Sequence, residues 1–226
     1  GLLKWFFYPG FTAYTGGLIR EPGLLQRRQA FDAAEWLKSR RIVRRPGERV
    51  VSLFCYENPA LPALLDALAG APTLLLATVG HASRQVAAAL GAPMARGALR
   101  AITLPHLSQL DFDHLLWSAD LNLVRGEDSF VRAQWAGLPF LWHAYPQHDG
   151  AHQAKLDAFL TRHLEGASGD WAQRCRALWL GWNGASGALQ LPPLEPWRVH
   201  CQAWRDKLAA HQDLGTQLLS FAREKS

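Results

Sequence analysis

The sequence predicts an α/β fold with a Rossmann-like, doubly wound parallel sheet, and two observations support this. From about residue 50 onward, short apolar runs alternate with segments of helical character. The runs are continuously apolar rather than alternating, which is typical of parallel strands covered by helices on both faces. Strand–helix units repeated with right-handed crossovers build such a sheet.

Each strand and helix follows from a local signal. The first apolar run, RVVSLFC, precedes a segment that starts with a proline and stops at Gly70, as helix boundaries often do. The same pairing then repeats along the chain. Predicted strands cover residues 49–55, 72–80, 98–104, 120–124 and 139–145. The helices between them are predicted over residues 59–70, 82–91, 108–119 and 128–137.

The predicted strand–helix units are flanked by an N-terminal and a C-terminal segment. Residues 1–30 are rich in Gly and Thr and are predicted to be a linker or interdomain crossing, whereas residues 31–200 form the Rossmann-like domain. Beyond Pro146 the pattern is helical, with helices predicted over residues 150–164, 171–183 and 195–225. Residues 201–226 are treated as a separate C-terminal helix. Tryptophans are expected to anchor the packing of this part: Trp171, Trp179, Trp182, Trp197 and Trp204.

Composition excludes several classes of protein. With 49% hydrophobic residues, 226 residues can bury a full core, so disorder is not expected. The net charge of +5 suits a phosphate-bearing partner but lacks the clustered basic stripe of a nucleic-acid binder, so no nucleic acid is expected. The one basic run, at 38–49, fits a solvated loop or a binding patch.

Cysteines, apolar runs and the first residues point to the cytoplasm. Cys55, Cys175 and Cys201 are too few for a disulfide framework and lack zinc-ligand spacing. No apolar run is long enough for a membrane span, and no secretory signal is present, so no membrane partner is expected.

The chain starts inside an apolar segment, and its single methionine is Met94. This pattern predicts a cut within a longer protein.

The turn RGEDS at residues 125–129 is the main candidate site, because it lies where a predicted strand passes into a helix. Ligands of open parallel sheets bind beyond the carboxyl ends of the strands, and a helix N-terminus favours anions. Arg125 offers a bidentate fork to phosphate, and Ser129 offers a hydroxyl donor. Glu127 and Asp128 allow two interpretations. Asp128 could cap the helix, or the carboxylates could handle a sugar hydroxyl or a cationic acceptor.

Two other strand ends carry groups suited to a nucleobase. Phe54, Tyr56, Glu57 and Asn58 follow the first strand, and His106 and Gln109 follow the third. Aromatic rings and exposed amides bind bases by stacking and edge hydrogen bonds, although Phe54 and Tyr56 could instead belong to the core.

Metal and nucleotide motifs give little support to other activities. His106 has no second ligand at metal spacing, and the histidines at 143, 148 and 152 are predicted to lie in a surface loop. The sequence has no GxGxxG and no Walker motif, which disfavours nicotinamide enzymes and nucleoside triphosphatases.

Several segments together resemble one family. They are PGFTAYTGGLIRE, VSLFCYENPAL, HQAKLDAFL and the long block from LPHLSQ through RGEDSFVRAQWAG to YPQ. In this order they are similar to EarP, the protein-arginine rhamnosyltransferases of bacterial elongation factor P. The resemblance implies an inverting glycosyltransferase of GT-B architecture that moves rhamnose from dTDP-β-L-rhamnose to one arginine of elongation factor P, without a metal or other cofactor. The chain would be the C-terminal, donor-binding half, and residues 201–226 would pack toward the family's N-terminal domain.

The resemblance also implies roles for individual residues. Glu127 would be catalytic. The donor would be bound by Phe54, Tyr56, His106, Leu107, Ser108, Gln109, Arg125, Gly126, Asp128, Ser129 and Tyr145. His106 departs from the family, in which phenylalanine is usual. The family's proposed general base, an aspartate of the N-terminal domain, has no counterpart in this chain, so the chain by itself is expected to be inactive.

Two other functions fit the same residues. One is a nucleotide-sugar-binding module without catalysis, and the other is a UDP-sugar enzyme of the same architecture, such as an epimerase. A preference for dTDP over UDP in binding would favour the rhamnosyltransferase.

Overall fold

The computed structural model describes residues 3–147 and 150–225, and its centre is a six-stranded sheet. The strands are β1 (Arg49–Leu53), β2 (Thr73–Ala77), β3 (Ala95–Arg96), β4 (Leu99–Thr103), β5 (Leu121–Arg125) and β6 (Phe140–His143). Their order is β3-β4-β2-β1-β5-β6, and all neighbours are parallel except the short edge strand β3. The predicted parallel α/β sheet is therefore confirmed, while β3 was not predicted.

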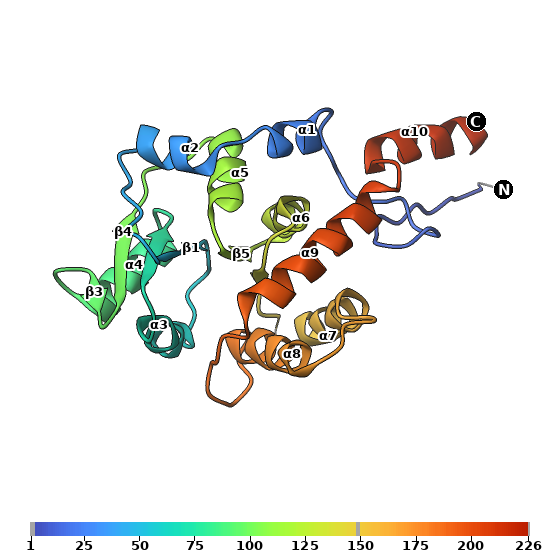
Figure 1. Cartoon of the computed structure of the whole chain (residues 1–226). Coiled ribbons are helices and arrows are strands. Elements are labelled where there is room, and N and C mark those ends of the chain that lie inside the picture. Colours follow the sequence, from blue (N-terminus) through green and yellow to red (C-terminus); the bar gives the residue numbers. More distant parts are fainter. Residues whose placement is uncertain (1–2, 148–149, 226) are drawn as a thin grey trace.

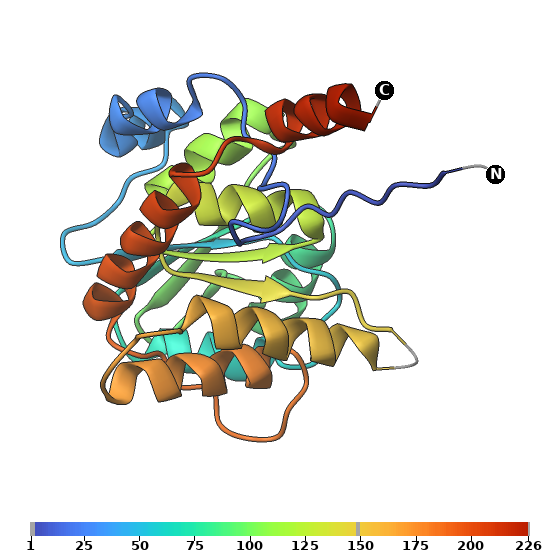
Figure 2. The same ribbon diagram turned by 90° about the vertical axis from the view of Figure 1, so that its right-hand side faces the viewer.

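Helices cover both faces of the sheet (Figures 1 and 2). On one face lie α2 (Ala33–Ser39), α5 (Gln109–Ser118) and α6 (Glu127–Ala136). On the other lie α3 (Leu61–Ala69), α4 (His81–Leu90), α7 (Ala151–His163) and α8 (Asp170–Trp182). Helix α9 (Leu194–Ala209) contacts both α6 and α8 and so links the two layers. The remaining helices are α1 (Leu24–Gln29) and α10 (Leu214–Lys225).

The core explains why the strands are continuously apolar. All five residues of β2 are buried, and so are all residues of β1 after the first. One core cluster, which includes Val50 and Leu74, lies under α2 and α5. The larger cluster lies under the other helices and contains Trp179, Trp182, Trp197 and Trp204, with Trp171 packed at its margin. The predicted packing role of the tryptophans is confirmed.

The single helix predicted over residues 195–225 is wrong, because the chain breaks into α9 and α10. The Arg20 guanidinium donates hydrogen bonds to the carbonyl oxygens of Ala209 and His211, which completes the end of α9. Asp213 then accepts hydrogen bonds from the Thr216 amide (3.0 Å) and hydroxyl (2.6 Å) and so caps α10. Two capping interactions therefore stop one helix and start the next.

Residues 1–30, predicted to be a linker, contain a helix and make contacts with the domain body. Leu18 and Leu24 are buried in the main core cluster, and the Trp135 indole donates to the Ile19 carbonyl at 2.8 Å. The assignment of these residues to an interdomain crossing stays a prediction. The predicted boundary at residue 201 falls inside α9.

The basic run at 38–49 is mostly engaged within the molecule. Arg40 pairs with Asp111, and Arg44 pairs with Asp120 at 2.9 Å. These ion pairs favour the loop over the binding patch. The three cysteines are unpaired and buried. None of the described helices combines the length and apolarity that a bilayer crossing requires.

The histidines at 143, 148 and 152 do not share one surface loop. His143 is buried in β6, because its ring packs between Tyr56 and Trp182, and His152 lies in α7. His148 lies outside the described residues. The surface-loop prediction is therefore wrong for His143.

A second buried histidine, His163, lies among aromatic rings. Its ring stacks on Phe159 at 5.1 Å and approaches Trp204 at the same distance, and neither ring nitrogen has a hydrogen-bond partner within the described residues. Burial, aided by His200, lowers the pKa of His163 to about 3. Burial and then the charge of Arg125 lower the pKa of His143 to about 4.

These histidines predict that the protein loses stability in mild acid. In the unfolded chain an imidazole has a pKa of about 6.5, so the unfolded state binds protons first as the pH falls. The contribution of these histidines to the free energy of unfolding should be constant above about pH 6.5 and should fall toward pH 4, by up to about 1.4 kcal/mol per pH unit for each histidine. His163→Phe should reduce the slope of unfolding free energy against pH, measured by urea denaturation. His106→Phe, at an exposed position, is the control, and an unchanged slope in His163→Phe would contradict the prediction.

Candidate functional site at the switch point of the sheet

The sheet changes its direction of growth at β1. The chain passes from β1 to β2 and β4 on one side, and then returns through α5 to β5 on the other side. In such sheets a crevice opens beyond the carboxyl ends of the two strands at the reversal, which here are β1 and β5. A cavity of about 580 Å³ lies at this position.

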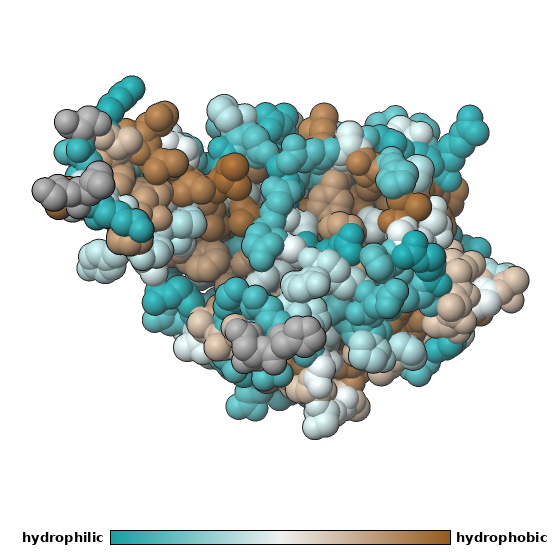
Figure 3. Space-filling model, turned by 180° about the vertical axis from the view of Figure 1, so that it is seen from behind, coloured by the Kyte–Doolittle hydropathy of each residue, from teal (hydrophilic) through white to brown (hydrophobic). Residues whose placement is uncertain are grey.

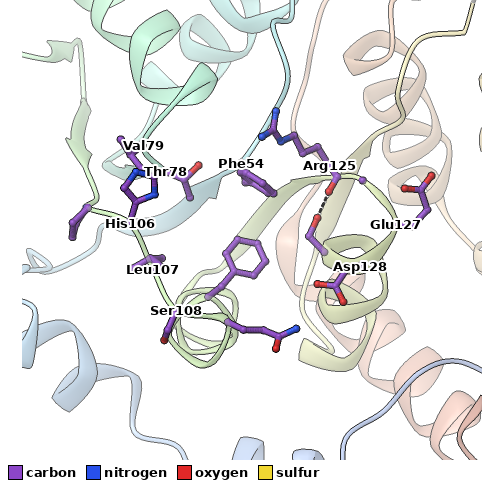
Figure 4. A pocket seen from close by; sticks show the side chains of 14 residues that line it. Phe54, Thr78, Val79, His106, Leu107, Ser108, Arg125, Glu127 and Asp128 are labelled. Atoms are coloured by element: carbon purple, nitrogen blue, oxygen red, sulfur yellow. Dashed lines mark hydrogen bonds between the residues drawn. The ribbon is translucent and has the colours of Figure 1, made fainter. Parts of the chain in front are cut away.

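The predicted site residues gather around this cavity. Every residue to which the family resemblance assigns a role lines it except Tyr56 and Tyr145, whereas Glu57 and Asn58, suggested by the first strand end, do not line it. Figure 4 shows Arg125 and Glu127 on one side, His106 and Ser108 on the other, and Phe54 between them. The roles assigned to these residues stay predictions.

Arg125, the last residue of β5, forms the cationic part of the site. Its guanidinium lies 4.4 Å from the ring centre of Phe54 and 4.6 Å from that of Tyr56. Cation–π contacts of this kind orient a guanidinium without neutralising its charge. Both rings are half-buried, so neither is a fully enclosed core residue. Tyr56 therefore reaches the site through Arg125, and Tyr145 packs edge-on against Tyr56 at 5.3 Å.

The turn after Arg125 exposes the start of α6. Gly126 precedes the helix with φ of 68°, a left-handed value that glycine adopts without strain. The Ser129 hydroxyl donates to the Arg125 carbonyl, which closes the turn (Figure 4). Trp142 donates from its indole to the Gly126 carbonyl at 3.1 Å. The first peptide N–H groups of α6 are thus presented at the cavity, where they favour an anion.

The adjacent carboxylates of this turn differ in their surroundings. Asp128 accepts a hydrogen bond from Arg132 at 2.9 Å, four residues further along α6. Glu127 is exposed, and its carboxylate has no hydrogen-bond or ion-pair partner among the described residues. Because Gly126 occupies the N-cap position, the interpretation of Asp128 as the helix cap is wrong. Both carboxylates still interact favourably with the helix dipole.

The opposite wall is the start of α5. The Ser108 hydroxyl accepts from the Asp111 amide at 3.1 Å and donates to the Asp111 carboxylate at 2.9 Å, so it caps the helix. Although partial burial opposes it, hydrogen bonds from Ser108 and Arg40 keep the pKa of Asp111 below its usual value. Gln109 and His106 are exposed at this wall and remain available to a ligand.

Asn58 does not present its amide to the cavity as predicted. It is buried, donates to the Trp182 carbonyl at 2.9 Å and accepts from the Ala60 amide at 2.9 Å. Gln85 of α4 completes this support, because its side chain donates to the Tyr56 carbonyl at 3.0 Å. The segment after β1 is therefore held firmly beneath the Tyr56 ring.

Several lining residues were missed. They are Thr78, Val79, Pro105 and Phe112. Thr78 and Val79 directly follow β2, so the strand-end rule that identified Phe54 could also have found them. Phe112 lies in the first turns of α5 and contacts Phe54 edge-on at 5.5 Å. Within the described part of the chain, no three His, Cys, Asp or Glu side chains are grouped as a metal site.

Comparison with known proteins assigns the chain to a family. The family model "Elongation-Factor P (EF-P) rhamnosyltransferase EarP" matches residues 1–223. Protein-arginine rhamnosyltransferases from Pseudomonas aeruginosa and Pseudomonas putida are 46% and 44% identical, over 98% and 99% of this chain. The relative from Shewanella oneidensis is 35% identical over 99% of the chain. This chain covers 64% of the length of each of these relatives.

A solved structure agrees with this assignment. It describes EarP-mediated arginine glycosylation of translation elongation factor EF-P, and it is 39% identical with a TM-score of 0.84. The match covers 98% of this chain and 76% of that one. The chain therefore belongs to the EarP family of protein-arginine rhamnosyltransferases.

Proposed function

We propose that this chain is the donor-binding part of an inverting GT-B glycosyltransferase that transfers rhamnose from dTDP-β-L-rhamnose to an arginine of elongation factor P. One observation carries most of the proposal: Arg125 and the N-terminus of α6 face the aromatic and amide groups of α5 across one cavity. The first wall suits a diphosphate, and the second suits a nucleobase.

The chemistry requires two tasks of the protein. A guanidinium nitrogen of the acceptor attacks the anomeric carbon, the bond from that carbon to the diphosphate oxygen breaks, and dTDP leaves with the electron pair. Since an arginine has a pKa above about 12, a carboxylate must orient the guanidinium, and the proton that the attacking nitrogen loses must pass to a carboxylate. The exposed, unpartnered carboxylate of Glu127 fits this role. Arg125 and the α6 N-terminus would stabilise the leaving diphosphate, so we propose that no metal or cofactor is needed.

The acceptor and the rest of the enzyme would approach the lobe formed by α10 and the N-terminal segment. No residue of α10 is buried, and Phe221 of α10 contacts Phe7 at 5.2 Å. Figure 3 shows apolar residues gathered on the lobe that α10 and the N-terminal segment form. Exposed apolar side chains there include Leu3, Trp5, Phe6, Leu218 and Leu219. We propose that this lobe packs against the remainder of the longer family proteins and that the protein acts in the cytoplasm.

Titration with nucleotides tests the proposal. The chain should bind dTDP and dTDP-rhamnose, bind UDP more weakly, and transfer no rhamnose on its own because it spans 64% of its relatives. Isothermal titration calorimetry measures the affinities, and mass spectrometry of elongation factor P measures transfer. Equal affinity for UDP and dTDP would favour a UDP-sugar enzyme, and no nucleotide binding would refute the proposal.

Arg125→Ala should weaken binding of dTDP-rhamnose by about 1.5–3 kcal/mol, because a charge-assisted bidentate contact is lost. The loss should become smaller as salt rises, since the site is open to solvent. Titrations at low and high salt would show this. An unchanged dissociation constant at low salt would mean that Arg125 does not contact the phosphates.

Glu127→Gln should reduce turnover of the intact enzyme by on the order of 10²-fold or more, the usual size for a positioned acid–base group. Its melting temperature should change little, because the Glu127 carboxylate is exposed and unpartnered. Single-turnover rhamnosylation beside thermal unfolding measures both effects. Asp128→Asn is the comparison, since it removes the negative charge from the ion pair with Arg132. Normal turnover in Glu127→Gln would return Glu127 to a structural role.

A further inference from the structure

A buried guanidinium behind the cavity collects three carboxylates. Arg132 is 5% exposed and is not among the residues that line the cavity. Its Nη1 lies 3.0 and 2.9 Å from the two oxygens of Asp113, its Nε lies 2.9 Å from Asp128 Oδ2, and its Nη2 lies 2.6 Å from Glu21 Oε1. These four residues are called the Arg132 cluster below.

The three carboxylates come from separate parts of the fold. Asp113 belongs to α5, Asp128 to the first turn of α6, and Glu21 to the segment before α1. Asp113 is itself buried, and both of its carboxylate oxygens accept hydrogen bonds from the guanidinium, so it holds Arg132 in place. The Nε of Arg132 then determines where the Asp128 carboxylate can lie.

Asp128 is the member of the cluster that reaches the cavity. Its side chain is 63% exposed, and its Oδ1 has no partner among the described residues, whereas Oδ2 is bound to Arg132. One oxygen is therefore anchored, and the other is free to accept a hydrogen bond. A sugar hydroxyl is a donor of the right kind.

The electrostatics are consistent with a fixed arrangement. Burial would lower the pKa of Arg132, but its hydrogen bonds with Glu21, Asp113 and Asp128 outweigh this and raise it above the usual value. Burial raises the pKa of Asp113 against the opposing effect of Arg132. A permanently charged, planar fork suits three acceptors in different directions, which the point charge of a lysine does not.

We propose that Arg132 is a positioning residue for sugar recognition, which holds Asp128 with one carboxylate oxygen directed at the sugar of the donor. This rests on the proposed function, in which the cavity binds a dTDP-sugar, and it adds that Asp128 contacts the sugar of that donor. Arg132 itself touches neither the sugar nor the nucleotide, and it acts only through Asp128.

The test compares donor with nucleotide. In Arg132→Lys, the affinity for dTDP-rhamnose should fall about tenfold, the size of one charge-assisted hydrogen bond, while the affinity for dTDP should be unchanged. In an Asp128→Asn background, Arg132→Lys should cause no further loss of the preference for dTDP-rhamnose. A general structural defect would instead weaken both ligands. Isothermal titration calorimetry on the whole chain measures both affinities for the wild type, Arg132→Lys, Asp128→Asn and the double variant.

Arg20→Lys is the matched control, because Arg20 also forms a fork of hydrogen bonds but at the end of α9. It should leave both affinities unchanged. If Arg132→Lys does not fold, Asp113→Asn, which loosens the grip on Arg132, should reduce the preference for dTDP-rhamnose in the same direction.

The outcomes separate the two proposals. A wild-type chain that binds neither dTDP nor dTDP-rhamnose would refute the proposed function. If the wild type prefers dTDP-rhamnose and Arg132→Lys keeps that preference, or if its effect adds fully to that of Asp128→Asn, the positioning role is overturned. A wild type that binds both ligands equally also overturns it.

Discussion

The pairing of β1 with β5 is the constraint on which the site depends. In the centre of this pair, the Ser52 hydroxyl and the Asn122 side-chain oxygen lie 2.5 Å apart, and Asn122 donates to the Leu116 carbonyl at 3.0 Å. Both side chains are buried, so a slip of one residue would leave a buried amide unsatisfied. The Phe54 amide continues the pairing by donating to Leu123 at 2.8 Å. Register in the sheet thus places Phe54 beside Arg125.

The two arginines near the cavity, Arg125 and Arg132, have different surroundings. Arg132 is surrounded by three carboxylates and is closed to ligands. Arg125 has aromatic neighbours, and no acidic side chain pairs with it in the described part of the chain. An anion arriving at Arg125 therefore does not have to displace an internal partner, and the rings have already fixed the orientation of the guanidinium.

The sheet and the position of the site could be predicted from the sequence because both depend on local patterns. Continuous apolar runs marked the parallel strands, and polar residues after those runs marked the cavity. Features that depend on distant contacts were missed. Arg20 ends α9 from 189 residues away, and Arg132 turns Asp128 from a supposed cap into an ion-pair partner. Helix α2 was missed although the sequence carries a local signal for its start. This signal is Asp32, which caps the helix by accepting hydrogen bonds from the amides of Ala34 and Glu35.

Two adjacent carboxylates beside an anion site are a physical conflict, and the helix resolves it. Successive residues of an α-helix point about 100° apart, since there are about 3.6 residues in each turn. Asp128 consequently turns back to Arg132, which offsets its charge, while Glu127 points to solvent with no partner among the described residues. In the proposed function, the repulsion between Glu127 and a bound diphosphate would be offset by Arg125 and by the α6 N-terminus. A carboxylate left unpaired in this way can accept hydrogen bonds from a cationic side chain such as arginine, which is the property that the proposed function requires of Glu127.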